Sequence, residues 1–230
     1  MSMSTVLITG IGKGIGHALA RKFLAEGDEV FGTYFSHQPT FDSAVAERIT
    51  LVRLNLASSD SIRECAQAIH ALGKKIDILV NNAGVLCDED ETTVVIEKLR
   101  TTLEVNLFGT IDLTERLIDA VRAPNGHIVN ISSTAGSLAL VDVTSSHYPR
   151  HYPSYKISKT ALNMYTRILA VRLRESGVTV SAVHPGWVKT EMGGADAEIT
   201  PEEAAEHIYT LAISQPETGQ FWYKGKNLPW

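Results

Sequence analysis

Tyr155 and Lys159 stand four positions apart in YPSYKISKTALNMYTRILAVRL, whose alanines, leucines and straight-chain residues predict a helix. Residues at this spacing lie on one helical face, so a phenol and an ammonium can point into the same cavity. A phenol has an unperturbed pKa of about 10, and a neighbouring cation lowers it toward neutrality. The pair therefore suits a tyrosine that exchanges a proton with a carbonyl or alcohol oxygen. Tyr152 and Lys156 share the spacing, but Pro153 disfavours helical geometry at Tyr152, so Tyr155 is the better acid.

A second informative feature is a cluster of glycines close to the N-terminus. A buried strand is predicted at residues 6–9, a helix with an apolar face follows, and glycines occupy positions 10, 12, 14 and 16 between them. A glycine-rich turn of this kind lets the backbone approach a phosphate, and the helix N-terminus adds unpaired N–H groups and the positive end of its dipole. A tight turn without a ligand is the alternative, which so dense a set of glycines disfavours.

The rest of the chain alternates between predicted strands and helices. Strands are expected at residues 5–9, 29–34, 50–55, 76–81, 127–131, 178–183 and 220–223, and helices at 14–26, 41–48, 59–72, 96–122, 153–176 and 201–214. This alternation predicts an α/β fold, a Rossmann-like doubly wound parallel sheet in three α/β/α layers. With 230 residues, 44% of them hydrophobic, a single domain over residues 1–230 is expected. Polar residues at the predicted strand ends should meet at one edge, where such sheets bind ligands.

Composition and charge exclude several classes of function. The net charge is −5 without a basic stripe, which argues against nucleic-acid binding. No apolar run approaches the ~20 residues of a membrane helix. The start MSMSTVLITG lacks a charged n-region, so we expect a cytoplasmic protein without membrane contact. Cys65 and Cys87 have no metal-like spacing and suggest no disulfide framework. The histidines are scattered apart from His147 and His151, and no metal site is expected.

Taken together, the motifs resemble those of the short-chain dehydrogenase/reductase family over nearly the whole chain. The similarity lies in six ordered segments: TGIGKGIG at 9–16, NNAG at 81–84, Asn106 in VNLFGT, Ser133 in IVNISS, YKISK at 155–159 and HPGWVKT at 184–190. It implies an oxidoreductase with the catalytic residues Asn106, Ser133, Tyr155 and Lys159. In such an enzyme Tyr155 donates a proton to a carbonyl, and Lys159 lowers the tyrosine pKa and bonds the nicotinamide ribose. Ser133 polarises the substrate oxygen, while Asn106 holds a water that links Lys159 to solvent.

The second predicted strand favours NADP(H) over NAD(H) as the cofactor. An acid at its end would bond the ribose 2′-hydroxyl and repel a 2′-phosphate, but EVFGTYFSHQ carries none near its end. Lys13 lies where family members that use NADP often carry a basic residue; the alternative is that it only faces solvent. By resemblance, the cofactor-binding residues are Gly10, Gly12, Lys13, Gly14, Ile15, Gly16, Tyr34, Ser36, His37, Asn55, Leu56, Asn82, Ala83, Gly84, Tyr155, Lys159, Pro185, Gly186, Val188 and Thr190.

Two asparagines near the expected cofactor allow more than one role. Asn55 stands where many relatives hold the adenine amino group with an aspartate, and its amide oxygen can accept the same hydrogen bond. A turn-forming role after the strand is the alternative. Leu56 would supply backbone contacts, and residues 82–84 would place small groups beside the adenosine ribose. Asn81 is expected to brace neighbouring strands.

Two segments are expected to form walls of the substrate pocket. The first is residues 140–153, which lengthen the connection between Ser133 and Tyr155. The second is residues 187–200, whose paired glycines suggest a mobile lid. Thr190 would meet the nicotinamide carboxamide, and Trp187 and Met192 would pack either on the substrate or in the core.

The leading hypothesis is an NADP-dependent carbonyl reductase or alcohol dehydrogenase acting on a small molecule. TGQFWYKGKNLPW and HPGWVKTEMGG resemble the carbonyl-reductase and C-factor branch of the family. The first alternative is a dinucleotide-binding signalling or regulatory protein with vestigial catalysis, which the intact catalytic set disfavours. The second is a pteridine or quinone reductase, the former suggested by TYFSH. Members of this branch are sometimes monomers, whereas the wider family forms dimers and tetramers through the Tyr155 helix; a monomer and a homo-oligomer both stay open.

Overall fold

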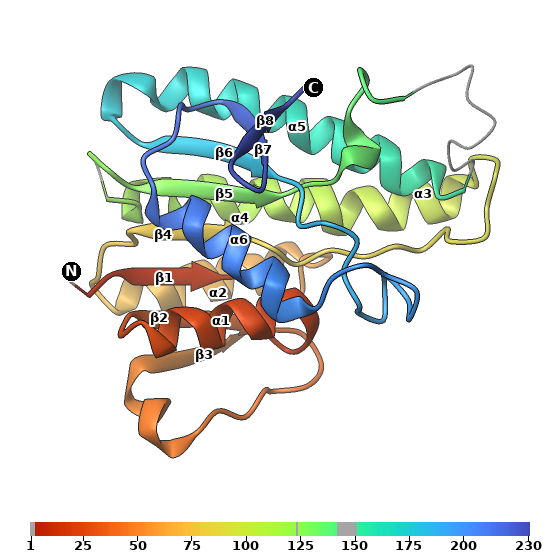
Figure 1. The fold of residues 1–230 in the computed structure, drawn as a ribbon. Coiled ribbons are helices and arrows are strands. Elements are labelled where there is room, and N and C mark those ends of the chain that lie inside the picture. The colour runs from red at the N-terminus through yellow and green to blue at the C-terminus, as the bar shows by residue number, and fades with distance from the viewer. Residues whose placement is uncertain (1–2, 123, 142–150) are drawn as a thin grey trace.

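The computed structural model describes residues 3–122, 124–141 and 151–230. Its centre is one sheet of eight strands in the order β3-β2-β1-β4-β5-β6-β7-β8 (Figure 1). The strands are β1 (Thr5–Ile8), β2 (Glu29–Tyr34), β3 (Ile49–Arg53), β4 (Ile78–Asn81), β5 (His127–Ile131), β6 (Thr179–Val183), β7 (Gln220–Tyr223) and β8 (Lys226–Leu228). Strands β1 to β7 are parallel to their neighbours, and β8 returns antiparallel to β7. The order reverses between β1 and β4, so the predicted doubly wound sheet is confirmed.

Helices cover both faces of the sheet and complete the three layers. The helices are α1 (Gly14–Ala25), α2 (Ser59–Ala71), α3 (Ile96–Leu103), α4 (Thr110–Leu117), α5 (Pro153–Leu173) and α6 (Pro201–Ile213). In Figure 1, α1 and α6 lie in front of the sheet, and α2, α4 and α5 lie behind it. Each face has an apolar core, with Phe23 and Ile208 on the front and Leu113 and Leu169 on the back. Within the described ranges, no helix is long and apolar enough to cross a membrane.

The helix predicted over residues 96–122 is interrupted. α3 ends at Leu103, a π-helical stretch follows at Glu104–Gly109, and α4 leads into a 3₁₀ turn at Ile118–Ala120. A Cβ on Gly109 would lie 2.0 Å from the carbonyl oxygen of Leu56, so the chain runs directly against the loop after β3 at this point. Single π-helical turns inside α-helices occur often at functional sites, and this one contains Asn106.

Two other elements differ from the prediction. The helix expected at residues 41–48 is a 3₁₀ helix at Ser43–Arg48, in which no residue is fully buried and only Val45 packs against the front core. Strand β8 was not predicted, since KNL is short and mostly polar. It follows Lys224 and Gly225, whose φ values of +46° and +73° suit the two central positions of a tight hairpin turn.

Buried amides join the centre of the sheet to the helices behind it. Asn81 donates from Nδ2 to Oδ1 of Asn130 at 2.8 Å and to Oγ1 of Thr114 at 2.9 Å. Asn130 donates from its own Nδ2 to Oγ1 of Thr166 at 2.9 Å. These bonds connect β4 to β5, and both strands to α4 and α5. The expectation that Asn81 braces neighbouring strands is therefore confirmed.

His127 ties the amino end of β5 to the front layer. Its side chain is buried, with Nδ1 3.0 Å from the carbonyl oxygen of Ala212 in α6 and Nε2 2.9 Å from Oγ of Ser181 in β6. Burial lowers the pKa of His127 to about 4, because the charged imidazolium would lose its hydration. The folded protein therefore keeps this ring neutral at pH values where an unfolded histidine, with a pKa of about 6.5, is charged.

The pKa of His127 predicts a loss of stability in mild acid. Between pH 7 and pH 4.5 the unfolded chain takes up a proton on this residue that the folded protein largely refuses, which lowers the free energy of unfolding by about 2 kcal/mol. Urea unfolding at both pH values should show that the wild type loses about 2 kcal/mol more than His127→Gln, which cannot titrate. An equal loss in both proteins would contradict a neutral, buried imidazole.

Candidate active site

The predicted motifs follow strands that end at the same edge of the sheet. The glycine turn follows β1, residues 82–84 follow β4, Ser133 lies just after β5, and His184 follows β6. These strands are parallel neighbours, so their carboxyl ends meet on the right of Figure 1. The structure therefore brings the motifs together, close to the point where the strand order reverses.

The glycine turn after β1 has the backbone geometry that glycine permits. Gly10 and Gly14 have φ values of +74° and +57°. A Cβ on Gly16 would lie 2.3 Å from the carbonyl oxygen of Gly10, so the start of α1 packs directly on the turn. Lys13, the N-cap residue of α1, makes no side-chain hydrogen bond to the first helical turn. Bare backbone and a helix start without a side-chain cap fit the phosphate groups of a dinucleotide.

The segment after β4 fastens this turn to the sheet. Oγ1 of Thr9 accepts hydrogen bonds from the backbone N–H groups of Asn82 and Ala83, both at 2.9 Å. The side chain of Asn82 donates to the carbonyl oxygens of Thr9 at 2.8 Å and Gly10 at 3.2 Å. Asn82 thus supports the glycine turn, a role that the sequence did not indicate.

Lys13 forms an ion pair with Glu191, in the segment after β6. The side chains are 72% and 77% exposed, and exposed pairs of this kind contribute about 0–1 kcal/mol. Lys13 therefore does more than face solvent, and a 2′-phosphate would compete with Glu191 for its ammonium group.

A second cation, Arg53 of β3, lies beside the end of β2, where sequence reasoning placed none. The Tyr34 hydroxyl bonds to a glutamine side chain at 3.2 Å, and Oγ of Ser36 lies 3.0 Å from Nδ1 of His37. Arg53, the last residue of β3, is exposed and aligned with Tyr34, and its Nε donates to a backbone carbonyl after β2 at 3.4 Å. Sequence analysis could have found Arg53, because residues that end neighbouring parallel strands lie side by side.

Asn55 takes the turn-forming role. Its Oδ1 accepts a hydrogen bond from the backbone N–H of Ala57 at 3.0 Å, and its own N–H donates to Oγ of Ser61 at 2.9 Å. Leu56 is buried. The structure thus gives the amide oxygen of Asn55 a local partner, which supports the alternative that the sequence had left open.

Ser133, Tyr155 and Lys159 converge beyond the end of β5. Oγ of Ser133 accepts a hydrogen bond from the N–H of Ala135 at 3.1 Å and lies close enough to the Tyr155 hydroxyl to act against the rise of its pKa. Lys159, one helical turn after Tyr155 in α5, is buried and donates from Nζ to the carbonyl oxygen of Ile131 at 2.8 Å. Its Nζ lies 5.5 Å from the centroid of the Tyr155 ring. The side chains of the predicted i, i+4 pair therefore lie close together.

Asn106 lies beside this group, with its amide directed at the chain after β4. Its Oδ1 accepts from the N–H of Val85 at 2.7 Å, and its Nδ2 donates to the carbonyl oxygen of Val85 at 2.9 Å and to Oγ of Ser158 at 3.1 Å. A Cβ on Gly84 would lie 3.2 Å from Oδ1 of Asn106 and 3.8 Å from Nζ of Lys159. A side chain at position 84 would therefore lie against both Asn106 and Lys159.

Burial shifts the pKa of both ionisable groups in the pair. Burial raises the pKa of Tyr155 to about 12, although the nearby Ser133 hydroxyl acts in the opposite direction. Burial lowers the pKa of Lys159 to about 8. Burial is the largest cause of the Tyr155 shift, because the phenolate would lose its hydration. The expectation that Lys159 lowers the tyrosine pKa stays a prediction. At neutral pH the phenol keeps its proton and the amine stays charged.

The segment after β6 is tied by its own hydrogen bonds. Nε1 of Trp187 donates to the carbonyl oxygen of Gly193 at 2.8 Å, and Oγ1 of Thr190 accepts from the N–H of Gly193 at 3.1 Å and donates to the carbonyl oxygen of Val188 at 3.3 Å. Trp187 and Met192 are exposed, so the alternative that they pack in the core is wrong. A Cβ on Gly14 would lie 3.2 Å from Cγ2 of Thr190, which brings this segment against the glycine turn.

The turn at Pro185 and Gly186 belongs to the same wall, and the other expected wall is described only in part. Gly186 has a φ of +93°, and a Cβ there would lie 2.6 Å from Cδ1 of Ile199, so the turn that contains Pro185 packs closely on the same segment. Of the wall at residues 140–153, positions 142–150 lie outside the described residues, and His147 is one of them. Among the described residues, no three His, Cys, Asp or Glu side chains are grouped to hold a metal.

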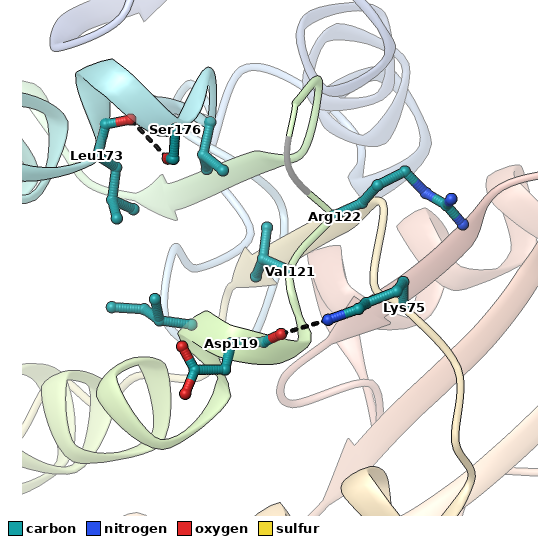
Figure 2. A pocket seen from close by; sticks show the side chains of 8 residues that line it. Lys75, Asp119, Val121, Arg122, Leu173 and Ser176 are labelled. Carbon is teal, nitrogen blue, oxygen red and sulfur yellow. Dashed lines mark hydrogen bonds between the residues drawn. The ribbon is translucent and has the colours of Figure 1, made fainter.

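A cavity of about 490 Å³ lies at the opposite, amino end of the strands (Figure 2). Its lining includes the apolar side chains of Val121 and Leu173 and the cations Lys75 and Arg122. Nζ of Lys75 donates to the backbone carbonyl of Asp119 at 2.6 Å. The cavity contains none of the predicted catalytic residues, so the candidate active site is the carboxyl edge and not this cavity.

Comparison with known proteins agrees with this arrangement. The family model of the short chain dehydrogenases matches residues 4–200. The chain belongs to this family. This short-chain dehydrogenase is thus an oxidoreductase, as its motifs indicated.

Individual relatives cover the short-chain dehydrogenase almost completely. It is 30% identical to carbonyl reductase 1 (NADPH) of Mus musculus, over 100% of this chain and 99% of the relative. It is 33% identical to a 3-oxoacyl-(acyl-carrier-protein) reductase of Aquifex aeolicus, over 92% and 84%. Among solved structures, NADPH-bound carbonyl reductase from chicken fatty liver aligns with a TM-score of 0.85 and 26% identity, over 100% and 95%. A short-chain dehydrogenase/reductase of Burkholderia multivorans with bound NADP aligns with 0.86 and 27%, over the full length of both chains.

The burial of Lys159 predicts an unusually acidic lysine. If the chain is reductively methylated with ¹³C, the methyl resonance of Lys159 should titrate near pH 8, because burial disfavours the ammonium. The resonance that is absent from Lys159→Met identifies it in the spectrum. A titration above pH 10 would mean that the ammonium is solvated and that the site is more open than the structure indicates.

Proposed function

We propose that this chain is an NADP(H)-dependent oxidoreductase that transfers a hydride between the nicotinamide and a carbonyl or alcohol substrate. The observation that carries the proposal is that Ser133, Tyr155 and Lys159 lie together at the carboxyl edge of the sheet. Lys159 is one helical turn after Tyr155, and Ser133 lies beside the Tyr155 hydroxyl. The similarity to carbonyl reductases, some of them with bound NADPH, supports carbonyl compounds as the substrate class.

Tyr155 acts as the proton donor during carbonyl reduction. Its raised pKa keeps the phenol protonated at neutral pH, so the proton is present when the substrate oxygen gains negative charge. The nearby ammonium of Lys159 then stabilises the phenolate that remains after the transfer. Because that ammonium has a pKa of about 8, its support weakens as the pH rises above this value.

Ser133 orients the substrate oxygen. Its Oγ already accepts a hydrogen bond from the N–H of Ala135, so its own proton is available to donate to Tyr155 or to a carbonyl oxygen. A donor that is fixed before the substrate arrives stabilises developing charge without reorganisation. Asn106 holds the backbone of Val85, the residue after Gly84, and we expect the link from Lys159 to solvent to run past Asn106.

The glycine turn, the uncapped start of α1 and the cations at its margin would hold the dinucleotide. When bound, NADP(H) supplies the hydride, and the protein contributes binding and orientation. Arg53 and Lys13 are the proposed partners of the 2′-phosphate, and Arg53 is the better placed because Lys13 is paired with Glu191.

The cofactor assignment predicts a selective effect of Arg53→Ala. Loss of one charged hydrogen-bond donor to the 2′-phosphate should raise the Kd for NADPH roughly tenfold and leave that for NADH unchanged, since NADH lacks this phosphate. Fluorescence titration of both nucleotides measures the effect, and Arg63→Ala, an exposed arginine in α2, is the control. An equal loss for both nucleotides would show that Arg53 only stabilises the fold.

The catalytic assignment predicts that Tyr155→Phe removes turnover while nucleotide binding remains. With a panel of aldehydes, ketones and quinones, the wild type should oxidise NADPH faster than NADH, and the variant should be slower by at least about 100-fold because the acid is lost. Absorbance at 340 nm measures turnover, and fluorescence titration checks NADPH binding. Wild-type rates in the variant would refute Tyr155 as the acid. Binding of NADPH without turnover on any substrate would favour the regulatory alternative.

A further inference from the structure

The helix that carries Tyr155 begins without a cap of its own. The N-cap residue of α5, Tyr152, makes no side-chain hydrogen bond to the first turn, and that turn contains no acidic residue. The first N–H groups of a helix have no partner within it, and helix ends fray unless these groups are satisfied. Because Tyr155 lies in this first turn, the position of its hydroxyl depends on whatever holds the turn in place.

Asp88 supplies the missing cap from the segment after β4. Its Oδ2 accepts a hydrogen bond from the backbone N–H of Ser154, the residue before Tyr155, at 2.5 Å. Asp88 is completely buried, and its Oδ1 has no hydrogen-bond partner among the described residues. Burying a carboxylate is costly, and a bond to a helix N-terminus is one of the few arrangements that offset the cost.

Two further contacts join the same segments. The N–H of Tyr152 donates to the carbonyl oxygen of Glu91 at 3.0 Å. Tyr152 itself has φ +53° and ψ +52°, a left-handed conformation that is strained for a tyrosine. Its ring stands edge-on to that of Tyr155, with centroids 6.2 Å apart. The charge of Asp88 also attracts the ammonium of Lys156, the residue after Tyr155 in α5.

We propose that Asp88 is a positioning residue that fixes the first turn of α5 and thereby the hydroxyl of Tyr155. The proposal rests on the proposed function, in which Tyr155 is the acid. Lys159 is anchored separately, one turn later, by the carbonyl of Ile131. Loss of Asp88 therefore displaces the acid relative to Ser133 and Lys159 and leaves the glycine turn intact.

The test compares Asp88→Ala with Asp88→Asn and two controls. Asn keeps an oxygen that can accept from Ser154, whereas Ala keeps none. Glu89→Ala removes an exposed charge from the same segment. Ser58→Ala removes a side-chain cap from α2, where Oγ accepts from the N–H of Ser61, and so matches the loss of a helix cap far from Tyr155.

Asp88→Ala should lower kcat by about tenfold or more, because misplacement of a reacting group by about 1 Å can cost on the order of 100-fold. The Kd for NADPH should stay within about twofold of the wild-type value, and Asp88→Asn should recover most of the lost kcat. Both controls should keep wild-type kcat. A kcat for Asp88→Ala equal to that of Ser58→Ala, or an equal loss of NADPH binding, would overturn the proposal.

Amide hydrogen exchange provides a readout that does not require activity. In Asp88→Ala the amides of residues 154–156 should exchange at least about tenfold faster, while those of the last turns of α5 stay unchanged. If exchange is faster in Asp88→Ala but the wild type has no activity, the proposed function is wrong while the role of Asp88 in holding the helix start is supported. Unchanged exchange at residues 154–156 would refute the positioning role, whatever the activity.

Discussion

The geometry of the candidate site depends on one buried ammonium group. Lys159 carries its charge into the protein, bonds to the carbonyl oxygen of Ile131, and forms no ion pair with a carboxylate of the described residues. This bond joins α5 to the end of β5, two residues before Ser133. Tyr155 is one turn before Lys159 on the same helix. This contact between helix and strand holds α5 against the segment that contains Ser133, and the bond from Ser154 to Asp88 holds the first turn of the same helix.

Small residues make this contact sterically feasible. A Cβ on Gly136 would lie 2.6 Å from the backbone carbon of Lys159, so the short turn after Ser133 packs directly on the backbone of α5. On the other side, Gly84 lies against Asn106 and Lys159. The site is therefore a place where backbones approach one another closely, and the ionisable side chains fill the little space that remains. Such exclusion of water explains why burial dominates the pKa of both Tyr155 and Lys159.

Sequence reasoning recovered the features that are local in the chain. Hydrophobic runs gave the seven parallel strands, and the spacing of glycines and of Tyr155 with Lys159 gave the two ends of the site. Contacts between distant segments were out of reach. The ion pair of Lys13 with Glu191, the alignment of Arg53 with Tyr34 and the bond from Asp88 to Ser154 each join residues that are far apart in sequence. The effect of burial on the pKa of Tyr155 and of Lys159 was out of reach for the same reason, since burial is a property of the whole fold.

The π-helical stretch between α3 and α4 makes the register of this region sensitive to chain length. An α-helix turns about 100° per residue, so removal of one residue between Glu104 and Gly109 would restore regular winding and rotate everything on one side by that angle. The amide of Asn106 would then swing away from Val85, and the glycine that abuts Leu56 would be replaced by a bulkier neighbour. A one-residue deletion would therefore break the contacts of Asn106 and of Gly109 together.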